Sequence, residues 1–392
     1  MPKRYYFTSE SVSEGHPDKV CDCISDSILD AFLEKEPEAR VAVETLVTKN
    51  LVVVAGEVRS KNVPDYDTVI REAIREIGYT GKDNSDFNAD TVEIINRIHS
   101  QSNEIAQGVD EDSDKEEGAG DQGLMFGYAS NDTEDLMPAP IYYAHKLIRR
   151  MAEKRKNGEK RLGPDAKSQV TFVYEDGKPV AVDTILISHQ HMDGVTQADV
   201  KSIVLDTIQE IIPAHFSPHE AKIFVNPTGS FNYGGPGADT GLTGRKIIVD
   251  TYGGMSRHGG GAFSGKDPTK VDRSAAYMAR YLAKNIVAAG FADCCEIQLC
   301  YAIGVAEPLA IYLDTFDTMK AGLTHDDLIK AIRETVSLTP KGIRTHLNLN
   351  RPIYTQSSSY GHFGRTATEA GHFSWEKTDI AEKLKAAVRI AA

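Results

Sequence analysis

The chain has 392 residues, a formal net charge of −13 and 41% hydrophobic residues. This length allows two or three domains with a full core, and the acidic balance argues against general nucleic-acid binding. No apolar run has the length of a signal peptide or a membrane span, and the five cysteines lack zinc-finger spacing, so we expect a cytoplasmic protein with reduced thiols.

Hydrophobic periodicity predicts helices and strands that recur in three similar groups. In chain order these are a helix at 20–34, strands at 40–47 and 52–58, a helix at 66–77, a helix at 142–151, strands at 169–174 and 180–187 around an Asp176-Gly177 turn, a helix at 198–212, a strand at 246–252, a helix at 272–289, strands at 296–301 and 309–314, and a helix at 326–335. Strand pairs packed under helices indicate the α+β class.

The stretch 100–120 interrupts this pattern. It is polar, carries the acidic run Asp110-Glu111-Asp112 and ends in Gly118-Ala119-Gly120. A loop this long inside a compact chain is usually functional or disordered. We expect a mobile lid that orders over a bound substrate; the alternative is an inert disordered loop.

A glycine-rich segment lies between the predicted strand at 246–252 and the helix at 272–289. Glycines let the backbone approach a ligand, successive free N–H groups bind anions, and Lys266 would add a positive charge. Because Asp267 follows Lys266, this is not a Walker A motif. A flexible surface loop is the alternative interpretation.

The run Ser13–Lys19 enters a predicted helix, whose backbone amides and dipole favour an anion. His16 could bond a phosphate or a leaving oxygen, and Asp18 could hold Mg²⁺. Asp272, beside the glycine-rich segment, is a second natural Mg²⁺ ligand. For both aspartates the alternative is helix capping without a function.

Glu44 and Glu57 lie on neighbouring predicted strands that are otherwise largely apolar. If the hairpin loop has an even number of residues, the two carboxylates share one face and should bind a cation or an ammonium group. If that face is exposed to solvent, the pairing of the two carboxylates does not indicate a binding site.

Further charged segments accompany these. Asp165 and Lys167 at the entry to a strand should point the same way; Gly120–Gly123 forms a polar turn; Arg245-Lys246 would stand at a strand entrance, with Asp239 upstream. Each could be an ordinary surface feature. Together they suit the positioning and charge stabilisation of a polyphosphate better than covalent catalysis.

The segments 15–19, 118–123, 165–168, 241–246 and 259–267 closely resemble the S-adenosylmethionine synthetases, above all the bacterial type, and the resemblance runs in order from residue 6 to 377. It implies three similar α+β domains of mixed or antiparallel sheet in a pseudo-threefold arrangement, which we assign to 1–101, 121–231 and 232–392, with a mobile loop at 102–120. It also implies ATP and L-methionine as substrates, two Mg²⁺ per site and K⁺, and a homodimer with shared active sites that pairs into a homotetramer.

The resemblance further implies roles for individual residues. The catalytic residues would be His16, Lys167, Lys266 and Asp121. The ATP contacts would be His16, Asp165, Lys167, Ser230, Phe231, Asp239, Arg245, Lys246, Ala262 and Lys266. The methionine contacts would be Glu57, Gln101, Asp239 and Lys270. The metal ligands would be Asp18 and Asp272 for Mg²⁺ and Glu44 for K⁺. Ser230 stands where family members often carry Arg.

The expected reaction transfers the adenosyl group of ATP to the methionine sulfur and then hydrolyses the triphosphate to phosphate and diphosphate. The sulfur is neutral and has no proton to lose, so no general base is required, whereas the triphosphate must be neutralised to leave. A kinase or ligase that leaves ADP or AMP, and a non-catalytic regulatory subunit, are the rival functions.

Overall fold

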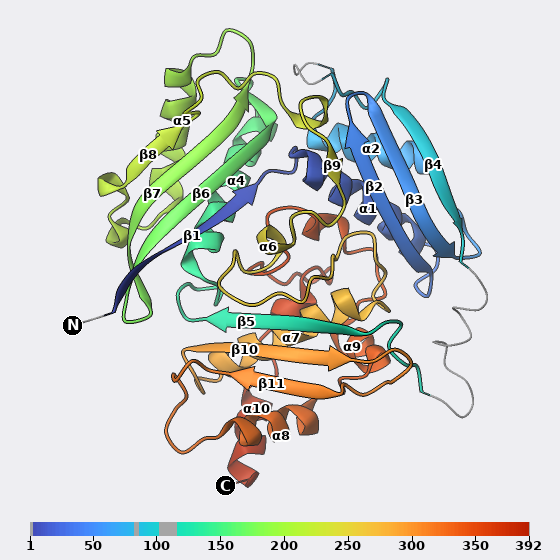
Figure 1. Ribbon diagram of the computed structural model, residues 1–392, viewed down its shortest axis with the longest axis vertical. Helices are drawn as coiled ribbons and strands as arrows, with labels where there is room; N and C mark the ends of the chain where they lie inside the picture. Colours follow the sequence, from blue (N-terminus) through green and yellow to red (C-terminus); the bar gives the residue numbers. More distant parts are fainter. Residues whose placement is uncertain (1–2, 82–85, 102–115, 392) are drawn as a thin grey trace.

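The computed structural model describes residues 3–81, 86–101 and 116–391, so most of the predicted lid lies outside the described residues. The strands of the described residues are β1 Arg4–Val12, β2 Arg40–Thr48, β3 Leu51–Arg59, β4 Glu93–Ser100, β5 Gly123–Ser130, β6 Leu162–Glu175, β7 Lys178–His191, β8 Lys222–Val225, β9 Gly241–Leu242, β10 Cys294–Tyr301 and β11 Ala310–Asp314. They form three sheets, ordered β4-β3-β2-β9, β1-β6-β7-β8 and β11-β10-β5 (Figure 1). Neighbouring strands are antiparallel except for the parallel pairs β3–β4 and β7–β8.

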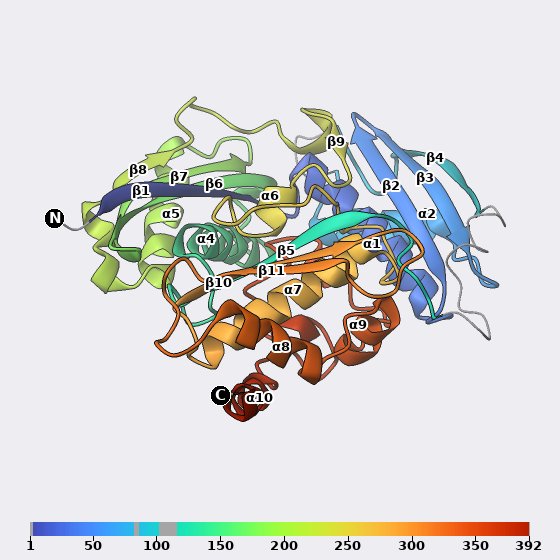
Figure 2. The same cartoon turned by 60° about the horizontal axis from the view of Figure 1, so that its bottom comes forward.

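The helices are α1 Pro17–Leu33, α2 Tyr66–Ile77, α4 Ala139–Lys156, α5 Gln197–Ile211, α6 Ile247–Asp250, α7 Val271–Ala288, α8 His325–Thr335, α9 Pro340–Leu347 and α10 Ala381–Ala391. Short 3-10 helices are η1 Ala214–Phe216, η2 Pro218–Glu220, η3 Gly235–Gly237, η4 Thr355–Ser357 and η5 Ser374–Glu376. Helix α1 covers the sheet of β2 and β3, α4 covers the sheet of β1 and β6, and α7 covers the sheet of β5 and β10 (Figure 2). Within the described ranges, every helix is too short or too polar to cross a bilayer.

Two strands join sheets whose other members lie far away in sequence. β1 runs antiparallel to β6, with Val12 opposite Lys167, and β5 runs antiparallel to β10, with Gly123 opposite Tyr301. The chain therefore passes from the end of β1 directly to the start of α1, between the first two sheets (Figure 1). This crossing brings the run Ser13–Lys19 into the middle of the molecule.

The periodic segments fold as predicted, with one exception. The hairpin of β2 and β3 pairs Ala42 with Glu57, and the Asp176-Gly177 turn has positive φ at both residues, as a tight hairpin turn requires. The predicted strand at 246–252 is wrong: α6 and a turn occupy it. β-branched residues at 247–249 favour a strand locally, but the buried Asp250 pairs with Lys19, and its carbonyl accepts the N–H of His362. Arg245 and Lys246 therefore precede a helix, not a strand.

Candidate active site

His16 caps the N-terminus of α1, with Pro17 at the first helical position, which suits proline. Its Nδ1 accepts the backbone N–H of Asp18 at 3.2 Å, so the ring proton of the neutral imidazole lies on Nε2. Burial, followed by the charge of Lys246, lowers the pKa of His16 to about 3. The side chain is therefore a neutral hydrogen-bond donor at physiological pH.

The segment before His16 is bonded to the start of β6. Ser13 Oγ donates to the Pro164 carbonyl at 2.7 Å and accepts from Ala166 N at 2.8 Å, and Ser13 N donates to the Ala166 carbonyl at 2.9 Å. These bonds set Asp165 and Lys167 beside the loop that carries His16.

Asp18 joins α1 to the segment 241–246. Its Oδ1 accepts from Leu242 N at 3.0 Å and its Oδ2 from Lys246 Nζ at 2.5 Å. Burial raises the pKa of this carboxyl, but the bonds from Lys246 and Leu242 hold it below its ordinary value. Arg245, next to Lys246, is exposed.

The capping alternative is wrong for both aspartates. His16 is the N-cap residue of α1, and Asp18 lies inside the first turn with its carboxylate turned to Leu242 and Lys246. Lys270 is the N-cap of α7, and Asp272 lies in the first turn, where Oδ2 accepts from Lys266 Nζ at 2.6 Å.

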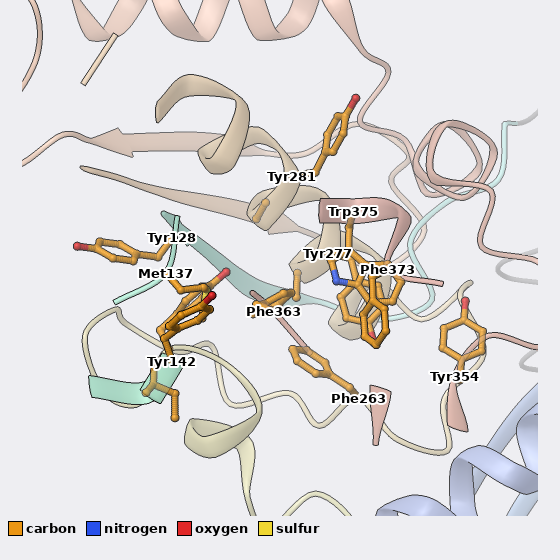
Figure 3. Close-up of a cluster of buried hydrophobic side chains, with 14 of the residues drawn as sticks. Tyr128, Met137, Tyr142, Phe263, Tyr277, Tyr281, Tyr354, Phe363, Phe373 and Trp375 are labelled. Carbon is orange, nitrogen blue, oxygen red and sulfur yellow. The ribbon is translucent and has the colours of Figure 1, made fainter. Parts of the chain in front are cut away.

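An aromatic cluster anchors the glycine-rich segment (Figure 3). Phe263 lies 5.5 Å from the Tyr277 ring and 4.8 Å from the His362 ring, and Tyr277 stacks on Trp375 at 3.8 Å. Gly265 has a φ of +80°, and a Cβ there would lie 1.9 Å from the Val43 carbonyl oxygen. Only glycine can therefore make this close approach to β2.

The three glycine-bearing segments meet around Ala262 and Asp272. A Cβ on Gly244 would lie 2.5 Å from the Ala262 Cβ, and one on Gly261 would lie 2.6 Å from the Asp272 carboxyl carbon. The Gly120–Gly123 turn lies beside Asp272 as well, since a Cβ on Gly123 would lie 3.4 Å from its Oδ1. Asp121, in this turn, is exposed and accepts the N–H of Gln122.

Asp165 is buried and only half satisfied. Its Oδ2 accepts from Gly235 N at 2.9 Å, whereas Oδ1 has no hydrogen-bond partner in the part of the chain that the structure describes. Burial raises the pKa of this carboxyl to about 6. A Cβ on the neighbouring Gly234 would lie 3.0 Å from the Phe231 ring, and the exposed Ser230 precedes Phe231. An unsatisfied acceptor near an aromatic ring is a fitting place for a nucleobase or ribose.

Glu44 and Glu57 share a face, as the hairpin register predicts, with Glu44 opposite Ala55 and Glu57 opposite Ala42. Both are exposed in the single chain, and Glu57 lies 3.7 Å from His99 Nε2. The face also carries half-buried apolar side chains such as Leu46 and Val53. Such a face is incompletely covered by this chain alone.

The predicted site residues fall into two groups, and the segments that carry them pair with different positions of β2. We call His16, Asp18, Lys167 and Lys246 the α1 cluster, and Lys266, Lys270 and Asp272 the α7 cluster. Leu242, bonded to Asp18, pairs with Leu46 of β2, whereas Lys266 bridges to Ala42. The two β2 residues in these pairings, Leu46 and Ala42, are about 13 Å apart along the strand.

The predicted methionine contacts are divided in the same way. Glu57 lies opposite Ala42, Gln101 N donates to the Val58 carbonyl at 2.9 Å, and Lys270 pairs with Asp267 at 2.6 Å, all near the α7 cluster. Asp239 is exposed at the far end of β2, where Thr240 Oγ1 meets Thr48 Oγ1. Ala42 and Thr48 are about 20 Å apart along the strand, so one chain does not bring Asp239 to Glu57.

Several buried residues that hold these loops in place lie outside the motif segments. Asp22, Asp26 and Arg273 bond the main chain of the site loops, and His191 Nε2 accepts the N–H of Phe231 at 3.0 Å. The four-residue spacing of the aspartates of α1 was the available signal, since it places them on one helix face.

The carboxylates suit Mg²⁺ even though no three His, Cys, Asp or Glu side chains of the described residues cluster closely enough to hold a metal alone. Mg²⁺ takes one or two carboxylates and completes its shell with water and phosphate oxygens. Asp18 and Asp272 each already hold a lysine ammonium, so both positions attract a cation.

Comparison with known proteins gives one consistent result. Family models described as the N-terminal, central and C-terminal domains of S-adenosylmethionine synthetase match residues 4–103, 116–231 and 233–377. Proteins named S-adenosylmethionine synthase from Paramagnetospirillum magneticum and Ruegeria pomeroyi are 59% and 58% identical to this chain, and each alignment covers 98% of this chain and 99% of the relative.

Proposed function

The chain belongs to the S-adenosylmethionine synthetase family, and we propose on that premise how its own residues join ATP to methionine. It makes S-adenosylmethionine: the methionine sulfur attacks C5′ of ATP, an S–C bond forms, and the C5′–O bond breaks with its electron pair leaving on the triphosphate. We further propose that water then cleaves the bound triphosphate into phosphate and diphosphate before release.

The leaving triphosphate is the demanding part of the reaction, and the paired lysines carry this proposal. Lys246 and Lys266 neutralise Asp18 and Asp272 at 2.5 Å and 2.6 Å. Magnesium bound by these carboxylates would supply charge neutralisation at the phosphate oxygens. The lysines would then be released to the triphosphate, where charge develops as the C–O bond breaks.

His16 acts as a donor in this proposal, not as a base. Its neutral ring presents Nε2–H, while the backbone of Asp18 holds Nδ1. This suits a hydrogen bond to the oxygen that leaves C5′. The sulfur has no proton to remove, so no base is needed.

The remaining substrate and metal contacts follow the positions described above. Asp165 and Phe231 would receive the nucleoside, together with Ser230, Arg245 and Ala262, and Lys167 would reach the phosphates. Glu57, Gln101, Asp239 and Lys270 would hold methionine. Asp121 lies on the turn next to Asp272, and Glu44 would bind K⁺ on its open sheet face.

We propose that the working unit is a homodimer whose sites are shared, and that dimers pair into a tetramer. The division of the predicted methionine contacts supports sharing, because within one chain Asp239 and Glu57 lie at opposite ends of β2, about 20 Å apart along the strand. The open, partly apolar face of β2 and β3 offers a surface for a second copy.

The decisive test of the reaction is mass spectrometry of the products formed from ATP, methionine, Mg²⁺ and K⁺. We expect S-adenosylmethionine, phosphate and diphosphate. Formation of ADP or AMP instead would favour the kinase or ligase alternative. His16→Asn should be strongly impaired, whereas His219→Asn, a matched change at an exposed residue, should behave as wild type.

Shared sites are tested by mixing two impaired variants, His16→Asn and Lys266→Met. In a mixed dimer one of the two sites contains His16 from one chain and Lys266 from the other, and is intact. An equal mixture should therefore recover about a quarter of wild-type activity if dimers exchange freely. Sites built within single chains would give no recovery.

A further inference from the structure

Helix α1 carries an aspartate at every fourth position, Asp18, Asp22, Asp26 and Asp30, on one face. Each of these carboxylates accepts backbone N–H groups from a segment more than 200 residues further along the chain. The helix thus holds several distant loops in register with its own first turn.

Asp22 holds the segment that ends in Lys246. Its side chain is 1% exposed, Oδ1 accepts from Gly244 N at 2.9 Å, and Oδ2 accepts from Lys19 Nζ at 3.0 Å. The fully buried Lys19 also pairs with Asp250 of α6, directly beyond Lys246. The loop is therefore fixed two residues before Lys246 and again four residues after it.

Asp26 holds the segment that ends in Lys266. Its Oδ1 accepts from Gly265 N at 2.9 Å, and the carboxylate binds Arg273 through two bonds of 2.7 Å and 2.9 Å, both side chains being 0% exposed. Arg273 Nη1 also donates to the Lys266 carbonyl at 3.1 Å. The main chain of Lys266 is thus held on both sides.

We propose that Asp22 and Asp26 are positioning residues of the adenosyl transfer, an inference that rests on the proposed function. Both carboxylates are buried and bonded to protein groups, and they fix the backbone that presents Lys246 and Lys266 relative to the helix that begins at His16 and Asp18. A charge-stabilising group displaced by about 1 Å can lose about 100-fold in rate. Loss of either anchor should therefore reduce turnover more than it reduces substrate binding.

Asp30 provides a matched control. It belongs to the same column and accepts from Tyr354 N at 3.0 Å and from Thr355 N at 2.8 Å, and Thr355 Oγ1 donates to it at 2.7 Å. The loop it holds carries none of the proposed substrate or metal contacts. An aspartate that serves stability alone should behave like Asp30.

The experiment compares Asp22→Asn, Asp26→Asn and Asp30→Asn in the full chain. Melting temperature, kcat, KM for methionine and the Kd for tripolyphosphate are measured for each. We expect all three to melt lower, but only the first two to lose about 30- to 100-fold in kcat, with weaker tripolyphosphate binding and a KM for methionine within about twofold of wild type.

Two results would overturn the proposal: a kcat within twofold of wild type in folded Asp22→Asn and Asp26→Asn, or an equal loss in Asp30→Asn. If Asp22→Asn does not fold, Asp22→Glu keeps the charge beside Lys19 and shifts only the carboxylate, and the same kcat loss is expected. Product formation by the wild type tests the proposed function separately, and tripolyphosphate binding tests the anchors even without turnover.

Discussion

Replacing Lys266 by Met separates stability from catalysis at one position. Lys266 and Asp272 are 2.6 Å apart with side chains 25% and 32% exposed, so solvent screens the pair and its loss should cost at most about 1 kcal/mol of unfolding free energy. In the proposed mechanism the same change also removes one cation from the leaving triphosphate. Loss of one preorganised charge partner costs about 100- to 1,000-fold in kcat, or about 2.7–4 kcal/mol.

The assay is a coupled phosphate-release measurement with a parallel urea titration. Lys154→Met is the control, because Lys154 is also paired with a carboxylate, Glu210 at 2.8 Å, but lies on α4 outside both clusters. We expect a large kcat loss only for Lys266→Met and similar, small stability changes for both. Wild-type turnover in Lys266→Met would remove this lysine from the mechanism and refute the reasoning.

Three further outcomes are expected. Glu44→Gln should abolish activation by K⁺ while activity with Mg²⁺ alone persists; full K⁺ activation in the variant would place the monovalent site elsewhere. Burial raises the pKa of Asp165 to about 6, so the folded state holds this proton more tightly than the unfolded state, and the carboxylate destabilises the fold as pH rises from about 4 to above 6. Asp165→Asn should then raise the free energy of unfolding by about 2–3 kcal/mol at pH 8 and little at pH 4, and an equal gain at both would contradict this sign. Arg280→Met should cost about 3–5 kcal/mol because it leaves the buried Glu376 with a reduced set of partners; urea unfolding should show partial recovery when Glu376→Gln is added, and no recovery would mean that the backbone carbonyls bound by Arg280 dominate.

Local sequence patterns predicted the structure correctly where it depends on residues that are close together in the sequence. The apolar spacing of 66–77 predicted α2 at its observed bounds, and an even two-residue turn fixed Glu44 and Glu57 on one face. Helix and hairpin geometry depend on contacts three, four or a few residues apart, and these are visible in the sequence. The motif segments also identified the family, and they contain most of the residues that we propose for the site.

Tertiary contacts decided what the patterns could not. The β-branched run at 247–249 predicts a strand, but contacts with Lys19 and His362 hold Asp250 in a helical turn. The roles of Asp22 and Asp26 depend on Gly244 and Gly265, more than 200 residues away. The four-residue spacing places these aspartates on one helix face, but it does not identify their partners, because a hydrogen bond to a distant backbone N–H leaves no period in the sequence. For the same reason, only the fold could show that Asp239 and Glu57 lie at opposite ends of β2.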